Sequence, residues 1–194
     1  MKRSLKFFSF WSLLALCTAA EVFNFCRKDN DSKRGSLTFA SSPYHPGMFY
    51  QWNRKTGWPA INNITGWDAT VPEGDSLEKT NDPSPTGWRI PTLAEIQKLC
   101  DTGNVTSEWI NKNGLTGRKF TDKATGKSIF LPAVGYCDGV DGTILSIGSY
   151  GGYWSSAAYD SDSRLAYYLS FDDGNAGWGS SARHCGFNVR SVAD

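Results

Sequence analysis

The sequence has almost no net charge, only two histidines, and no long hydrophobic run after its first twenty residues. Its 20 Lys and Arg balance 19 Asp and Glu, which gives a formal net charge of +1 over 194 residues. A near-neutral chain without a basic cluster is not typical of proteins that bind nucleic acid or acidic membranes, so we expect neither partner. No later segment is long and apolar enough to cross a bilayer as a helix, and we predict no transmembrane segment.

Groups suited to catalysis or metal binding are also scarce. His45 lies between a tyrosine and a proline and reads as a surface residue, and the other histidine is His184. His184 precedes Cys185, but neighbours on a strand point to opposite faces, so we expect no thiolate–imidazole pair there. The sequence contains no Cys-x-x-Cys and no Cys/His spacing typical of zinc sites. We therefore expect no catalytic residues, no metal and no cofactor.

The first segment has the pattern of an export signal. Residues 1–20 combine a basic start, an apolar stretch over 7–16 and a small-residue cleavage site at 18–20, which predicts a signal peptide and export. Cys17 leaves a second possibility open, a lipoprotein anchored by acyl chains at that cysteine. Leu16 fits this alternative poorly, because such processing prefers a small residue before the cysteine.

Four cysteines remain after such a cleavage: Cys26, Cys100, Cys137 and Cys185. They allow three pairings, and the sequence does not choose among them. An exported protein can keep disulfides. A buried thiol is an equal alternative for Cys100, which follows the apolar positions of a predicted helix.

The remaining composition favours short strands and ordered loops. Aromatic residues make up 14% of the chain, with eight Trp, and glycine occurs 20 times. This mixture is not typical of a helical bundle. We divide the chain into the signal peptide (1–20), a polar, mixed-charge linker (21–46) and a single domain (47–194).

Local patterns predict two helices in that domain. The first covers residues 92–100, because Thr92 can cap it while Glu95 reaches back to the cap. A shorter helix is expected over about 107–112, ending before Gly114. Alternating or hairpin-like patterns predict strands at 48–52, 119–121, 128–131, 165–171 and 185–189.

Four motifs together resemble one family. They are Thr86–Thr92 (TGWRIPT), Phe130–Tyr136 (FLPAVGY), Gly152–Ser156 (GYWSS) and Gly186–Arg190 (GFNVR). In this order they are similar to the Fibrobacter succinogenes major paralogous domain family, which is abundant in secreted and surface proteins of gut Bacteroidetes. The resemblance runs from about Gly47 to Asp194. It implies an α+β, C-type-lectin-like fold with two helices, a small twisted antiparallel sheet and long loops rich in glycine and aromatic residues.

Two departures from the family pattern bear on stability and activity. Family members often carry cysteines at the positions of Ser84 and Ser191, so the disulfide that the resemblance implies is absent here. The family is also distantly similar to formylglycine-generating enzymes, which work through paired cysteines near the end of the fold. Only Cys185 lies in that region of this chain, so we do not transfer that activity.

Candidate ligand-binding residues lie in the connections near the end of the chain. Trp178 and Asn175 belong to a segment, 172–182, that reads as a loop between strands, while Tyr159, Asp160 and Asp162 belong to the preceding connection. A Trp or Tyr ring stacks on sugars or apolar ligands at low entropic cost. Acidic loops at 138–142, 160–162 and 172–173 resemble calcium ligand sets, but Asp-Gly turns explain them without a metal. Trp58 and Trp67 are weaker candidates.

These features predict an exported binding or adhesion module, displayed at the cell surface and without catalysis. Its ligand would be a carbohydrate or a protein. A structural or tip subunit of a surface assembly is the alternative, and an enzyme has the least support. Fold-level resemblance carries much of this functional expectation.

Overall fold

The computed structural model describes residues 26–27, 38–39, 45–60 and 64–194. The predicted signal peptide, Cys17 and most of the predicted linker lie outside these residues. Within the linker, the backbones of β1 (Cys26–Arg27) and β2 (Thr38–Phe39) pair in antiparallel fashion.

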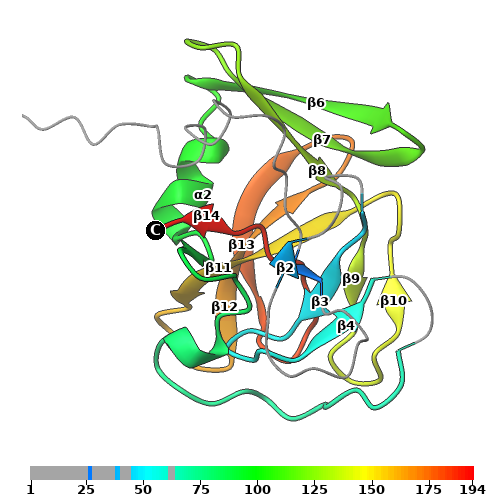
Figure 1. Ribbon diagram of the computed structural model, residues 1–194, viewed down its shortest axis with the longest axis vertical. Helices are drawn as coiled ribbons and strands as arrows, with labels where there is room; N and C mark the ends of the chain where they lie inside the picture. The colour runs from blue at the N-terminus through cyan, green and yellow to red at the C-terminus, as the bar shows by residue number, and fades with distance from the viewer. Residues whose placement is uncertain (1–25, 28–37, 40–44, 61–63) are drawn as a thin grey trace, which may run out of the picture.

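The domain itself is mostly β structure arranged in several small antiparallel sheets (Figure 1). Two sheets have three strands, in the orders β6–β7–β8 and β11–β12–β13, and two-stranded pairs join β3 to β4, β5 to β14 and β9 to β10. The helices of the described residues are the short 3-10 helix η2 (Lys79–Asn81) and α2 (Leu93–Leu99). The strands are β3 (Met48–Tyr50), β4 (Gly57–Pro59), β5 (Trp88–Arg89), β6 (Val105–Lys112), β7 (Leu115–Asp122), β8 (Ser128–Pro132), β9 (Tyr136–Cys137), β10 (Ile144–Leu145), β11 (Gly151–Ala158), β12 (Leu165–Phe171), β13 (Ala176–Ala182) and β14 (Val192–Ala193).

The prediction of an α+β, C-type-lectin-like fold with two helices is wrong. In the part of the chain that the structure describes, α2 is the α-helix, and strands arranged in small sheets make up most of the regular structure. The second predicted helix, over 107–112, lies within β6.

The segment after α2 forms a hairpin because of the turn that follows it. Asn113 and Gly114 have positive φ angles of 53° and 82°, as both central residues of a type I′ hairpin turn require. The turn lets Lys112 face Leu115, and the pairing continues to Val105 opposite Asp122. The pattern of the same residues also fits a short amphipathic helix, which is why the sequence predicted a helix over 107–112.

The predicted first helix is confirmed, together with its cap. The side-chain oxygen of Thr92 accepts a hydrogen bond from the Glu95 backbone N–H at 3.3 Å, and Glu95 accepts one from the Thr92 N–H at 2.8 Å. This reciprocal pair satisfies two donors that a helix start otherwise leaves unpaired. The cap thereby fixes where α2 begins.

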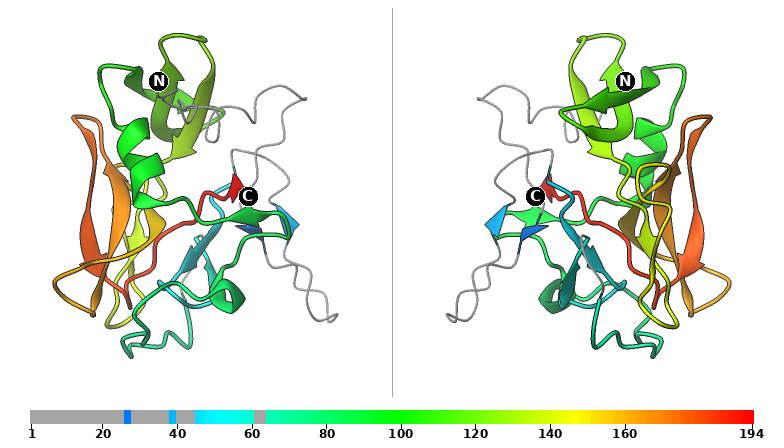
Figure 2. Two further views of the ribbon diagram at one scale, coloured as in Figure 1. Left: turned by 90° about the vertical axis from the view of Figure 1, so that its left-hand side faces the viewer. Right: turned by 90° about the vertical axis from the view of Figure 1, so that its right-hand side faces the viewer.

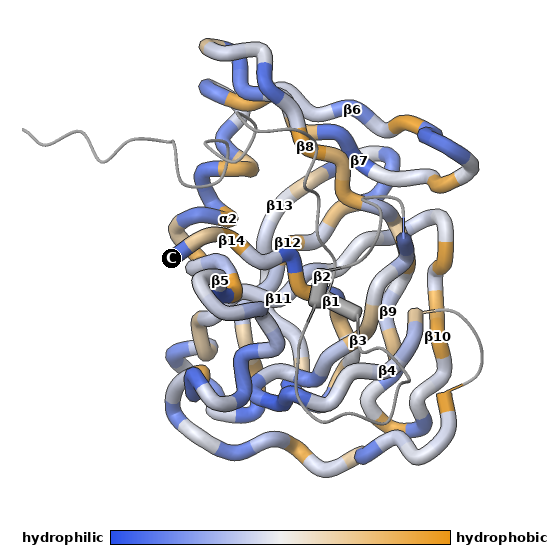
Figure 3. The backbone as a smooth tube through the Cα atoms, viewed as in Figure 1, coloured by the Kyte–Doolittle hydropathy of each residue, from blue (hydrophilic) through white to orange (hydrophobic). Residues whose placement is uncertain are grey.

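Several of the predicted strands are confirmed, unlike the second predicted helix. The hairpin predicted from 119–121 and 128–131 is confirmed by β7 and β8, and the strand predicted over 165–171 is β12. Figure 3 shows the hydrophobic colouring of β8, whose residues 129–132 are buried. The strand predicted over 48–52 is confirmed in part by β3.

The β11–β12–β13 sheet lies between two hydrophobic clusters, one on each face. Tyr153 pairs with Leu169, and the next residue along β11, Trp154, pairs with Tyr168. Because successive side chains alternate between faces, the first pair faces one cluster and the second pair faces the other. The first cluster includes Ile96 and Leu99 of α2, Phe120 of β7 and Leu131 of β8; the second includes Tyr50, Trp52, Phe187 and Val189.

Two adjacent glycines let large rings lie directly on β11. A Cβ atom at Gly151 would lie 2.1 Å from the Phe171 ring, and one at Gly152 would lie 2.2 Å from the Phe187 ring. No side chain fits at these separations, so the Gly-Gly pair that precedes Tyr153 is a packing requirement of both faces.

The end of the chain ties these parts together. The predicted strand over 185–189 appears as isolated bridges, which join Gly186 to Cys137, Phe187 to Tyr50 and Asn188 to Tyr153. Ser84 and Ser191, where the resemblance implies a disulfide, lie side by side with 2.7 Å between their hydroxyl oxygens. A hydrogen bond thus joins the approach to α2 to the last segment of the chain.

Candidate functional site

Three aromatic side chains form a row on the β11–β12–β13 sheet. The rings of Tyr159 and Tyr167 have centroids 5.2 Å apart, and those of Tyr167 and Trp178 are 6.1 Å apart. Their planes are tilted by 64° and 67°, the edge-to-face arrangement that aromatic pairs favour. We call Tyr159, Tyr167 and Trp178 the aromatic ladder.

Strand register explains why Trp178 is both fixed and open to solvent. It pairs with Leu169, a buried residue of the first cluster, so both side chains lie on the same face of the sheet. Its neighbours on that face along β13 are Ala176 and Ser180, which are too small to cover an indole. Trp178 is consequently 48% exposed, while its ring still contacts Tyr167. Figure 2 shows β12 and β13 at an outer border of the molecule, beside α2.

The charged groups near the ladder leave the phenol of Tyr167 protonated at neutral pH. Arg164 donates hydrogen bonds to Asp162, one of them at 2.7 Å, and they lower the pKa of that carboxyl to about 2. The pKa of Tyr167 is raised, chiefly by burial and further by the negative charge of Asp160. Because its pKa is already far above neutrality, Tyr167 keeps its phenol proton and can donate as well as accept hydrogen bonds.

The structure brings together only part of the predicted site. Tyr159, Asp160 and Asp162 lie at the end of the sheet where β12 begins, whereas Asn175 lies in the turn at the other end of the β12–β13 hairpin. In that turn Asp172 accepts hydrogen bonds from the backbone N–H groups of Gly174 and Asn175. The predicted loop over 172–182 is therefore a turn at 172–175 followed by β13, and Trp178 is a strand residue.

Tyr167 is the ladder residue that sequence reasoning missed. The alternation over 165–171 correctly predicted its strand, and that pattern also placed it on the same face as Leu169. Its contact with Trp178 depends on which strand pairs with β12, which no local pattern specifies. The sequence did offer one signal for Tyr167: it is an aromatic residue on the apolar face of the predicted strand, near the start of that strand.

The acidic loops at 138–142 and 172–173, which resemble calcium ligand sets, contain carboxylates that accept turn hydrogen bonds. Asp138 accepts a hydrogen bond from the Val140 N–H at 2.7 Å, and Asp141 accepts one from the Thr143 N–H at 2.8 Å. Among the residues with described side chains, no group of three or more His, Cys, Asp or Glu is placed to hold a metal ion.

The described cysteines are free thiols whose pKa values are raised by burial. Cys100, Cys137 and Cys185 form no disulfide, and the side chain of Cys26 lies outside the described residues. Burial raises the pKa of Cys100 to about 11 and that of Cys137 to about 12, and it raises the pKa of Cys185 as well. Since the thiolate is the reactive form, these groups are poor nucleophiles at neutral pH.

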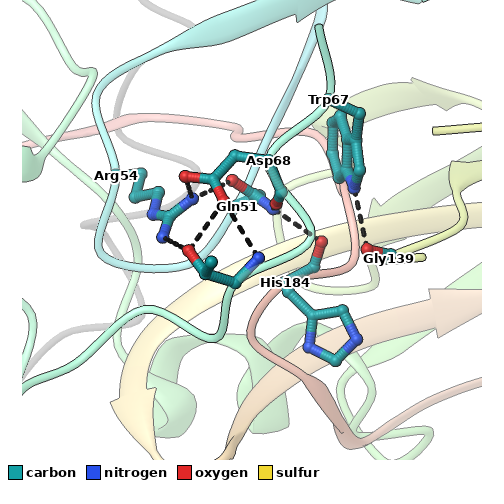
Figure 4. A network of polar contacts seen from close by, with 7 residues as sticks. Gln51, Arg54, Trp67, Asp68, Gly139 and His184 are labelled. Atoms are coloured by element: carbon teal, nitrogen blue, oxygen red, sulfur yellow. Dashed lines mark hydrogen bonds and ion pairs between the residues drawn. The ribbon is translucent and has the colours of Figure 1, made fainter. Parts of the chain in front are cut away.

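The weaker candidate Trp67 is an anchor between loops. Its indole N–H donates to the Gly139 carbonyl at 2.9 Å (Figure 4). The centroid of its ring lies 4.5 Å from that of Trp58. Beside it, Gln51 donates to the backbone oxygens of Asp68 at 2.6 Å and His184 at 2.9 Å. These bonds hold the first loop region against the end of the chain.

Comparison with known proteins identifies the family of the domain. No curated protein and no solved structure is significantly similar to the chain. In the described part of the chain, no helix combines the length and the hydrophobicity that a transmembrane span requires. The model of the Lcl C-terminal domain matches residues 48–193, nearly the whole domain predicted from Gly47 onward. This is the Fibrobacter-type paralogous family that the four motifs indicated. The lectin-like fold that the resemblance implied is not the fold of this chain. The chain thus belongs to the Lcl C-terminal domain family.

Proposed function

We propose that this protein is an exported, surface-associated module that binds a carbohydrate through the aromatic ladder and catalyses no reaction. The observation that carries the proposal is the half-exposed indole of Trp178, held by Tyr167 on a rigid sheet. Membership of the Lcl C-terminal domain family supports a surface-associated module, and the signal-like residues 1–20 support export.

The chemistry of the ladder fits a sugar better than a purely apolar ligand. Aromatic faces stack against the C–H faces of sugar rings, while hydroxyls need hydrogen-bonding groups at the rim. The phenols of Tyr159 and Tyr167 provide such groups, and Asp160 is exposed at the same end. Tyr167 and Trp178 lie on strands, and Tyr159, which directly follows β11, donates its backbone N–H to the Leu165 carbonyl at 3.1 Å. The rings therefore need little ordering when a ligand binds.

The absence of catalysis is supported by the state of the reactive groups described. A nucleophile needs an adjacent base or a lowered pKa, but burial shifts the pKa of the Cys100, Cys137 and Cys185 thiols upward. None of these thiols lies in the aromatic ladder. The ladder itself offers two phenols and an indole, and exposed Asp160 adds a carboxylate beside it; these groups suit binding.

The test is a glycan array followed by titration calorimetry on the best ligand. Wild type is compared with Trp178→Ala, Tyr167→Ala and the control Val140→Ala, which removes an exposed apolar side chain outside the ladder. Each ladder substitution should weaken binding by about tenfold or more, as truncation of a binding hot spot does. The control should bind like wild type. Binding that is indifferent to both ladder substitutions would contradict the proposal and favour a structural subunit instead.

A further inference from the structure

Several pairs of residues in this chain can react with themselves, because an Asp or Asn stands directly before a glycine. These pairs are Asn113-Gly114, Asp138-Gly139, Asp141-Gly142 and Asp173-Gly174. In such a pair the glycine backbone nitrogen can attack the side-chain carbonyl carbon of the residue before it, since glycine has no Cβ to hinder the approach. Asparagine is the more labile of the two residues, because its side-chain nitrogen can leave as ammonia. The fold then decides which pair reacts.

In the three aspartate pairs, a hydrogen bond occupies the backbone of the glycine. The hydrogen-bond partners are the carbonyl of Asp138 for the Gly142 N–H (3.1 Å), the carboxylate of Asp172 for the Gly174 N–H (2.9 Å) and the side chain of Cys185 for the Gly139 backbone. An attack by any of these nitrogens would first have to break its hydrogen bond, which costs free energy. The fold therefore protects the aspartate pairs.

The asparagine pair has no such protection. Asn113 and Gly114 are exposed in the turn at the outer end of the β6–β7 hairpin (Figure 1). In the part of the chain that the structure describes, neither the Gly114 N–H nor the Asn113 side chain makes a hydrogen bond. A Cβ atom built at Gly114 would meet nothing within 4 Å. The peptide between the two residues can therefore rotate toward the asparagine side chain without a collision and without losing a hydrogen bond.

We propose that Asn113 is a self-modification site, where the folded chain loses ammonia and takes up water to give aspartate and isoaspartate. The Gly114 nitrogen gives up its proton and bonds to the Asn113 Cγ, which closes a succinimide ring. The side-chain nitrogen leaves with that proton as ammonia. Water then opens the ring: cleavage of the new N–Cγ bond gives aspartate, and cleavage of the bond from the Gly114 nitrogen to the Asn113 backbone carbonyl carbon gives isoaspartate. Neither step is an oxidation or a reduction.

The isoaspartate product should loosen the hairpin. Its backbone runs through Cβ and Cγ, so the turn gains a methylene group and loses the geometry of a type I′ turn. The pairing of Lys112 with Leu115 next to the turn should then open. β6 is the outer strand of its sheet, so its end can separate without disturbing another strand pair. Both products add one negative charge, which lowers the formal net charge from +1 to 0.

The test follows the full chain during incubation in mildly alkaline buffer. Samples are digested at intervals and analysed by mass spectrometry that separates aspartyl from isoaspartyl peptides. The unmodified Asn113 peptide should be lost, with isoaspartate as the larger product. Asn104 and Asn175 are internal controls that should stay intact, since both are exposed but precede residues that carry a Cβ. An Asn113 that stays intact, or that converts no faster than the two controls, would overturn the proposal.

A second comparison separates the added charge from the altered backbone. Asn113→Asp carries the same charge with an ordinary backbone, and Asn113→Gln should stay unmodified because its longer side chain must close a larger ring. Hydrogen exchange of the Lys112 and Leu115 amides should be faster in the isoaspartyl fraction of aged wild type than in Asn113→Asp. Exchange in β12 should be the same in both. Equal exchange at Lys112 and Leu115 would overturn the inferred loosening of the hairpin.

Discussion

Glu95 is the residue in which cap, strand and helix meet. Its carboxylate accepts two hydrogen bonds of 2.8 Å from the guanidinium of Arg89 on β5, and one from the Thr92 N–H. The hydrogen bonds from Arg89 are the main reason that the pKa of Glu95 falls from 4.5 to about 2. The sequence predicted the cap, but not the ion pair with Arg89, because that contact depends on how β5 approaches the helix.

Replacing Glu95 with Gln should destabilise the domain at neutral pH by about 2 kcal/mol, the usual scale for hydrogen bonds to a charged group. A carboxyl whose folded pKa is depressed stabilises the fold above its unfolded pKa, and that contribution is lost as pH falls. The difference in unfolding free energy between wild type and Glu95→Gln should therefore shrink as the pH falls from about 4.5 to 2. Urea unfolding at several pH values measures it, and a gap independent of pH would contradict the assignment.

Ser84 and Ser191 provide a second test at the residue scale. Their oxygens are 2.7 Å apart although the residues are separated by 107 positions. The double substitution Ser84→Cys with Ser191→Cys should form a disulfide that stabilises the domain by about 2–4 kcal/mol relative to its reduced form. Mass spectrometry and thermal unfolding with and without reductant check this. A pair of cysteines that stays reduced under oxidising conditions would show that the two segments do not meet as described.

Among the elements, those with local signals were predicted and those set by partners were not. The capping box predicted α2, and the alternating pattern of residues 165–171 predicted β12. β6 was taken for a helix because the Asn113–Gly114 turn signal was overlooked. β13 was taken for a loop because its glycines and serines have low strand propensity, and it is a strand because β12 supplies a partner.

The Asn113–Gly114 turn gives a prediction for the β6–β7 hairpin. Gly114 has φ of 82°, where a side chain is strained, so Gly114→Ala should destabilise the domain by about 1 kcal/mol. Gly174→Ala is the matched control in the β12–β13 turn, since Gly174 is outside the left-handed region and a Cβ there makes only ordinary contact. Chemical denaturation compares the two. Equal effects would argue against a type I′ turn.

Across the whole molecule, the end of the chain joins elements that are distant in sequence. Residues 186–188 bridge to Cys137, Tyr50 and Tyr153, and the two hydrophobic clusters pack on opposite faces of the sheet that carries the ladder. The four motifs predicted the family, and each contributes residues to this packing. The lectin-like fold that the resemblance implied was wrong, and the motifs did not predict the ladder, because the arrangement of the sheets and the ladder both depend on pairings between distant segments.

The most direct test of the central claim, that the ladder is the binding surface, is to follow the tryptophan indole N–H signals by NMR during titration with a glycan ligand. The chain has eight tryptophans, and Trp178→Phe assigns the signal that matters. We predict that the Trp178 signal shifts first and most, while that of Trp67, bonded to Gly139, stays in place. A ligand that binds while shifting Trp67 and leaving Trp178 unchanged would contradict the account.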